Sequence, residues 1–361
     1  MVAPIRHRCY ALTAELTVVY SPIDGAAGLR ARRGKWNGGE LRPPVTLIIG
    51  CTGCGKGAVG RLLAERLDAE IISVDSMKVF RRMDIGTAKP SAEARSRVPH
   101  HLLDVAEPCE DFSVAQFAER AERAIADIHN RDRMVLAVGG TALYFKALTE
   151  GLFDGPGSDA ETRARLHREA DENGRAALHA RLATVDPVAA KRIHPNDLRR
   201  IVRALEVFEL TGQQISQLQT QWDTRRTVAS DPLAGRWRFI GLVRDREDQS
   251  GRTNRRVQRM IEAGWVEEVR SLLAEPRPIS TTARQAVGYA EIIQHLTGGL
   301  ALADAIEKIK INTRKLSKAQ RTWFKRFRDT RWFEVAADDH AETVADRIMA
   351  DRELQWPKSP R

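Results

Sequence analysis

A glycine-rich segment at residues 50–57, GCTGCGKG, constrains the fold of this chain more than any other stretch. It follows the apolar run 45–49 and precedes a helical pattern at 58–67, so the glycines fall at a strand-to-helix turn. In such a turn, backbone N–H groups, the positive end of a helix dipole and a lysine charge converge and bind polyphosphates. We therefore expect a phosphate-binding loop made of Gly50, Cys51, Thr52, Gly53, Cys54, Gly55, Lys56 and Gly57.

The last position of this loop departs from the usual motif. Gly57 stands where Ser or Thr normally offers a hydroxyl to Mg²⁺, which predicts a weaker metal site in which water replaces the hydroxyl. Cys51 and Cys54 form a C-x-x-C, which elsewhere is a redox pair or half of a zinc site. Because Cys9 and Cys109 are distant in sequence, we interpret the pair as incidental. A glycine turn that serves packing alone is the alternative to phosphate binding.

Length and charge bound the rest of the chain. With 361 residues it is long enough for a main domain and a smaller one. Its net charge of +10 favours a polyanionic partner, although a basic chain can also be merely soluble. Four cysteines without a disulfide-like pattern suit a reducing cytoplasm, and no apolar run approaches the roughly 20 residues of a membrane span. Residues 1–43, rich in Gly and Arg without a sustained period, predict a weakly ordered N-terminal extension.

From residue 44 onward, strand and helix patterns alternate. Further apolar strands are expected at 70–74 and 134–138, with a helix at 114–128 between them. This alternation predicts an α/β fold, a three-layer parallel sheet of the P-loop type. Ligands collect at the carboxyl ends of such strands, where Asp75 and Thr141 stand. Asp75 is there a candidate general base, a water-mediated Mg²⁺ ligand or a solvated turn residue, and spacing alone does not separate these roles.

Several long motifs then follow in order. They occupy residues 75–81, 83–90, 98–101, 138–144, 193–197, 203–207, 286–289 and 313–324. With the loop, they closely resemble the tRNA dimethylallyltransferases over about residues 44–335. The resemblance implies transfer of a dimethylallyl group from dimethylallyl pyrophosphate to N6 of an adenosine. That adenosine lies on the 3′ side of the anticodon in tRNAs that read codons beginning with U.

The resemblance also implies roles for particular residues. The loop would hold the leaving pyrophosphate together with Mg²⁺ as the cofactor, and the catalytic positions match Asp75, Thr141 and Arg270. Basic clusters in the second half of the chain independently favour RNA contact, although any one of them can be a solvated helix face. The residues expected to bind tRNA are Asp75, Ser76, Met77, Lys78, Thr141, Arg163, Arg199, Arg200, Arg203, Gln285, Gly288, Tyr289, Lys318 and Arg321.

The same comparison suggests a domain organisation. Residues 44–156 and 232–335 are expected to form the catalytic core with basic C-terminal helices. Residues 157–231, rich in Ala, Arg and Glu, resemble a helical insertion that contacts tRNA, and 336–361 would be a C-terminal tail. We expect a monomer in the cytoplasm.

Two departures from the family pattern leave alternatives open. Gly57 replaces Ser or Thr, and Lys78 replaces a frequent Gln in the base-reading segment. A small-molecule kinase would use the same loop for ATP, but it normally needs the hydroxyl that Gly57 lacks. A catalytically silent RNA-binding protein is the other alternative, against which the presence of Lys56, Asp75 and Thr141 argues.

Overall fold

The structure, a computed structural model, describes residues 44–153, 155–219, 235–354 and 356. Across these residues, six strands form one parallel sheet in the order β3-β2-β4-β1-β5-β6. The expected N-terminal extension at 1–43 and the segment 220–234 lie outside the described residues. The strands are β1 (Val45–Gly50), β2 (Ala69–Val74), β3 (His100–His101), β4 (Met134–Gly139), β5 (Trp237–Arg244) and β6 (Thr330–Val335).

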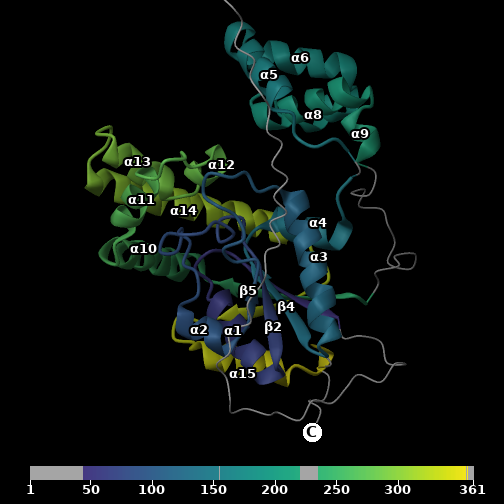
Figure 1. The fold of residues 1–361 in the computed structure, drawn as a ribbon. Coiled ribbons are helices and arrows are strands. Elements are labelled where there is room, and N and C mark those ends of the chain that lie inside the picture. Colours follow the sequence, from purple (N-terminus) through teal and green to yellow (C-terminus); the bar gives the residue numbers. More distant parts are fainter. Residues whose placement is uncertain (1–43, 154, 220–234, 355, 357–361) are drawn as a thin grey trace, which may run out of the picture. The chain divides into compact units, whose positions relative to one another are not determined.

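Strand β1 lies inside the sheet, and its side chains are buried on both faces. Val45, Leu47 and Ile49 pack with one layer of helices, and Ile48 packs with the other. The first layer includes α3 (Val114–Asn130), α4 (Ala142–Glu150) and α14 (Leu302–Phe324). The second consists of α1 (Lys56–Leu67) and α15 (Ala341–Ala350) (Figure 1). The three-layer α/β fold expected from the sequence is confirmed.

The expected helix boundaries hold to within a few residues. The helix expected at 114–128 extends two residues further, and its N-cap Ser113 forms a capping box with Gln116. Helix α8 (Leu198–Thr211) begins after its N-cap Asp197, whose side chain accepts from the Arg200 N–H. It ends at Gly212, whose φ of 70° is the left-handed conformation typical of a helix end.

Helices α5 to α9 share a hydrophobic cluster of their own, in the range where the sequence suggested a helical insertion. Leu166, Leu178, Leu182 and Leu205 are buried in it. These helices are α5 (Ala160–Asn173), α6 (Arg175–Val185), α7 (Pro187–Arg192), α8 and α9 (Ile215–Leu218).

Five further helices precede α14 in the chain. Between two of them, Trp265 is buried against Tyr289, and their ring centroids lie 5.7 Å apart. A Cβ at Gly288 would come within 1.9 Å of the Trp265 ring, so only glycine permits this packing. The helices are α2 (Ala92–Arg97), α10 (Arg246–Glu262), α11 (Trp265–Leu273), α12 (Thr281–Arg284) and α13 (Tyr289–Leu296).

The segment expected as a C-terminal tail, 336–361, contains helix α15. Val344, Ala345 and Ile348 of this helix are buried against α1, so at least this part of the segment belongs to the core. A short 3-10 turn follows at Arg352–Leu354. No helix among the described residues is long and apolar enough to cross a membrane.

Candidate active site

The phosphate loop joins the end of β1 to the start of α1. Gly53 and Gly55 have φ values of 87° and 98°, left-handed conformations in which a side chain would be strained. Gly55 is the N-cap of α1, so the helix N-terminus and its dipole lie at the loop. Lys56 is the first helical residue, and its Nζ donates to the Cys51 carbonyl oxygen at 3.3 Å. The loop therefore has the conformation that its glycines predicted.

Side chains of α10 and α14 hold the loop in place. Gln320 accepts from the Thr52 N–H at 2.8 Å and donates to the Gly140 carbonyl at 2.9 Å. It thereby joins the loop to the end of β4. Gln249 donates to the Thr52 carbonyl at 2.6 Å, and Arg321 donates to Gln249 at 2.6 Å. The bonds of the two glutamines orient backbone groups of the loop and of the turn beside it, and Arg321 holds the Gln249 side chain.

Sequence reasoning did not identify the two glutamines. Ser317, Gln320 and Arg321 are spaced i, i+3 and i+4 on α14 and share one face. Ser317 also donates to the Thr52 carbonyl, at 3.3 Å. A polar stripe on a helix that packs against an apolar core was the available signal.

The carboxyl ends of β2 and β4 meet beside the loop. Val74 pairs with Gly139, where a Cβ would lie 1.9 Å from the Val74 carbonyl oxygen. Because glycine allows this close approach, the turn after β4 places Thr141 against the turn after β2. The Thr141 hydroxyl accepts from the Ser76 N–H at 3.0 Å. The structure thus brings together the two segments that the sequence placed at one edge.

Asp75 lies at this edge with one carboxylate oxygen engaged. Its Oδ1 accepts from the N–H groups of Met77 at 2.9 Å and Lys78 at 3.3 Å. For Oδ2 no hydrogen bond is found within the described parts of the chain. The carboxylate is therefore oriented by the backbone and keeps one oxygen for a proton.

Four cationic side chains surround Asp75 and the loop. Burial, together with the charges of Lys56, Arg256 and Arg61, lowers the pKa of Lys78 to about 8, while the charge of Asp75 opposes this shift. Burial also lowers the pKa of Arg256, and Asp75 acts against that shift. Like charges at close range repel one another, and a bound anion offsets that repulsion. The arrangement suits a polyanion bound at the loop.

Comparison with known proteins agrees with this geometry. Residues 78–327 match the family described as IPP transferase. The tRNA dimethylallyltransferase of Geobacter metallireducens is 48% identical over 82% of this chain and 94% of its own length. That of Symbiobacterium thermophilum is 42% identical over 88% and 97%. This chain belongs to the IPP transferase family. The resemblance seen in the sequence motifs is confirmed.

Solved structures of IPP transferases share the fold. The tRNA isopentenylpyrophosphate transferase of Bacillus halodurans is 36% identical, with a TM-score of 0.61 over 86% of this chain and 97% of its own. A eukaryotic dimethylallyltransferase acting on tRNA is 25% identical, with a TM-score of 0.69 over 88% and 81%. The chain therefore spans nearly the whole of its bacterial relatives.

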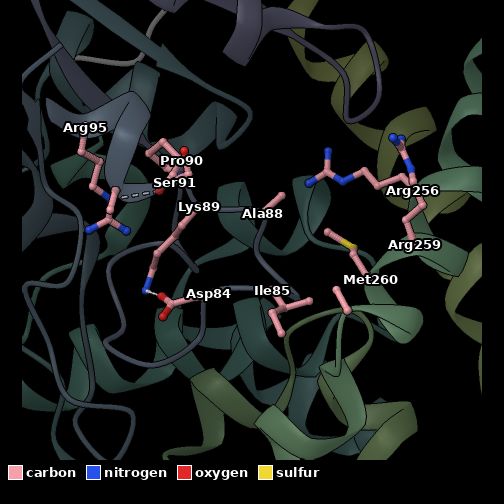
Figure 2. A pocket seen from close by; sticks show the side chains of 12 residues that line it. Asp84, Ile85, Ala88, Lys89, Pro90, Ser91, Arg95, Arg256, Arg259 and Met260 are labelled. Carbon is pink, nitrogen blue, oxygen red and sulfur yellow. Dashed lines mark hydrogen bonds and ion pairs between the residues drawn. The ribbon is translucent and has the colours of Figure 1, made fainter. Parts of the chain in front are cut away.

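A cavity of about 700 Å³ lies between residues 84–95 and helix α10 in this IPP transferase (Figure 2). Arg256 and Arg259 line it from α10. On the opposite wall, the Lys89 ammonium is fully engaged, with Asp84 at 2.7 Å and Asp104 at 2.6 Å. Arg95 on that wall likewise pairs with Asp104, at 2.7 Å, so of the cations that line the cavity Arg256 and Arg259 are those without an ion pair among the described residues.

Some expected site residues support the cavity wall. Tyr289 is buried and donates its hydroxyl to Glu268 at 2.6 Å. Glu268 also accepts from the N–H groups of residues 84–86 at 2.7–3.2 Å, so it fixes that segment.

Two other expected site residues are exposed. Gln285 lies at the end of α12. Arg270 is exposed and pairs with Glu267 of its own helix, and no contact with Asp75 or the loop is found among the described residues.

Arg163 and Arg203, both expected to bind tRNA, have a buried internal partner in common. Glu206 is fully buried, and Arg163 donates to both of its oxygens at 2.8 and 3.1 Å. Arg203 donates to Glu206 at 2.7 Å and to the Pro156 carbonyl at 2.7 Å. Burial alone would raise the pKa of Glu206, but the two arginines hold it below its ordinary value. Arg163 therefore joins α5 to α8, and Arg203 joins α8 to the segment that precedes α5.

Other expected tRNA-binding residues are exposed. Arg199, Arg200 and Lys318 lie on the surface of their helices. Arg200 is 3.4 Å from Asp197 one turn before it. Their charges are accessible to a phosphate.

The side chains present do not form a magnesium site by themselves. Among the described residues there is no group of three or more His, Cys, Asp or Glu that would hold a metal ion. Gly57 offers no hydroxyl, and the Asp75 carboxylate stands among cations. Within the described parts of the chain, Cys51 and Cys54 likewise belong to no group of His, Cys, Asp or Glu that would hold a zinc ion. Burial and the neighbouring Cys54 raise the pKa of the Cys51 thiol, which disfavours a reactive thiolate.

Proposed function

We propose that this chain transfers the dimethylallyl group of dimethylallyl pyrophosphate to N6 of an adenosine in tRNA. The target is the adenosine on the 3′ side of the anticodon in tRNAs that read codons beginning with U. The observation that carries the proposal is the phosphate loop beside Asp75 and Thr141 in a member of the IPP transferase family. Relatives at 42–48% identity are named tRNA dimethylallyltransferase.

We propose a task for each side of the reaction. The bond between the allylic carbon and the pyrophosphate oxygen breaks, and the pyrophosphate takes its electron pair. Lys56 and the loop N–H groups neutralise the charge that develops on that oxygen. The N6 nitrogen forms the new bond to carbon, and the free oxygen of Asp75 accepts the proton that N6 loses.

The tRNA partner accounts for the exposed basic residues. Arg199, Arg200 and Lys318 would contact backbone phosphates, and Lys78 would do so next to the target base. Turning that base out of the anticodon loop costs a few kcal/mol, which phosphate contacts offset. We propose that the enzyme acts as a monomer in the cytoplasm.

Mass spectrometry of tRNA nucleosides from cells with and without this gene tests the function. We expect N6-dimethylallyl-adenosine, or its modified forms, to disappear from the deletion strain and return with the wild-type gene. Purified protein should prenylate an anticodon stem-loop when given dimethylallyl pyrophosphate. An unchanged nucleoside profile, together with tRNA binding but no transfer, would indicate the silent RNA-binding alternative. Phosphoryl transfer from ATP to a small molecule would indicate a kinase.

A further inference from the structure

The structure shows what occupies the neighbourhood of the missing hydroxyl at Gly57. A Cβ built on Gly57 would lie 3.7 Å from Nη1 of Arg61, and apart from its chain neighbours and the nearby backbone of α1 no other described atom lies within 4 Å of it. Arg61 is one helical turn further along α1, so the two positions share a face. Its guanidinium thus lies beside the place where the Ser or Thr of a usual phosphate loop presents a metal-binding oxygen.

The Arg61 guanidinium has no hydrogen bond or ion pair within the described parts of the chain. The carboxylate that acts on it, Glu65, is itself 3.6 Å from Arg97. Burial lowers the pKa of Arg61, yet an arginine keeps its charge at any physiological pH. A half-buried cation without a direct partner is costly until an anion arrives.

We propose that Arg61 is a pyrophosphate-binding residue, whose guanidinium supplies beside Gly57 the positive charge that a hydroxyl-held Mg²⁺ supplies elsewhere. A guanidinium donates two parallel N–H groups and so matches two phosphate oxygens. Glycine at position 57 leaves that approach open, whereas a Thr side chain would stand against the guanidinium. Pyrophosphate binding by this chain then does not depend on Mg²⁺. This proposal shares one premise with the proposed function, namely that the loop holds a pyrophosphate.

Calorimetric titration of the full chain with inorganic pyrophosphate tests this, once with excess EDTA and once with excess Mg²⁺. The wild-type protein binds in both buffers. Arg61→Ala loses about 10-fold or more of its affinity in EDTA, the scale of a charge-assisted hydrogen bond. The double variant Gly57→Thr/Arg61→Ala regains affinity only when Mg²⁺ is present. Arg66→Ala is the matched control, because Arg66 lies on the same helix but pairs with Asp346 at 2.8 Å.

Thermal unfolding without ligand shows whether a variant has simply failed to fold. Arg61→Ala should unfold at the wild-type temperature or above it, since no direct partner of Arg61 is lost. Wild-type affinity of Arg61→Ala in EDTA would overturn the proposal, and so would wild-type binding that needs Mg²⁺. If the wild-type protein bound no pyrophosphate in either buffer, the loop would not be a pyrophosphate site and the proposed function would fail as well.

Discussion

At the scale of single residues, Asp75 has two tasks that substitution can separate. Its Oδ1 orients the following turn, and its other oxygen is the proposed base. Asp75→Asn keeps an oxygen for the backbone N–H groups but does not accept the N6 proton. We expect both Asp75→Asn and Asp75→Ala to lower turnover by about 10²-fold or more, with little change in tRNA affinity. Single-turnover transfer to a stem-loop measures this; near-normal turnover in Asp75→Asn would reduce Asp75 to an orienting residue.

Lys78 gives the unliganded enzyme a pH dependence. Since its pKa is lowered to about 8, its charge is present below that pH and is lost as the pH rises through it. We expect tRNA affinity to weaken between about pH 7 and about pH 9, a range in which exposed lysines stay charged. Fluorescence anisotropy with a labelled stem-loop checks this. Lys78→Gln should bind more weakly at pH 7 but without that dependence, and an equal decline in both proteins would exclude Lys78 as its source.

At the scale of elements, Gln320 links three parts of the core. Gln320→Ala would leave the Thr52 N–H and the Gly140 carbonyl without their side-chain partner. We expect a loss of about 1–3 kcal/mol in the free energy of unfolding. Lys318→Ala, an exposed change two residues earlier on α14, should leave that free energy within about 0.5 kcal/mol of wild type. Denaturant titration measures both, and equal stability of the two variants would show that the bridge does not hold the loop.

Among the strands, the sequence predicted those that are mostly apolar and missed those with a polar face. Strands β1, β2 and β4 are buried on both sides, so each has a largely apolar sequence. Strand β6 lies at the sheet edge with Arg331, Trp332 and Glu334 exposed, and its pattern is that of a surface segment. Helix α15 follows that unrecognised strand. The order of the strands depends on pairings between distant residues, which no local pattern encodes.

In the candidate site, as among the strands, the sequence predicted only the residues that carry a local signal. The loop glycines, Asp75 and Thr141 carry local signals, namely a turn motif and the ends of apolar runs. Gln249 and Gln320 act through hydrogen bonds to residues about 200 positions or more away, so only the folded chain reveals them. Arg203 looked like an RNA contact because its charge is visible in the sequence, whereas its buried partner Glu206 is not visible as buried.

At the scale of the whole molecule, the excess positive charge should appear in the salt dependence of tRNA binding. Each phosphate contact that is lost reduces the slope of log affinity against log salt by about one. We expect this from Arg199→Ala and Lys318→Ala, whose side chains are exposed, with no change in thermal stability.

Arg203→Ala provides the contrast on the same helix as Arg199. Because Arg203 bonds to Glu206 and to the Pro156 carbonyl, its loss leaves a buried carboxylate with one partner fewer. We expect a lower melting temperature for Arg203→Ala, of a size that Arg199→Ala does not show, because a weakened buried ion pair costs stability. Salt titrations of stem-loop binding and melting curves for the three variants decide between the roles. Unchanged slopes for Arg199→Ala and Lys318→Ala would place the RNA surface elsewhere on the molecule.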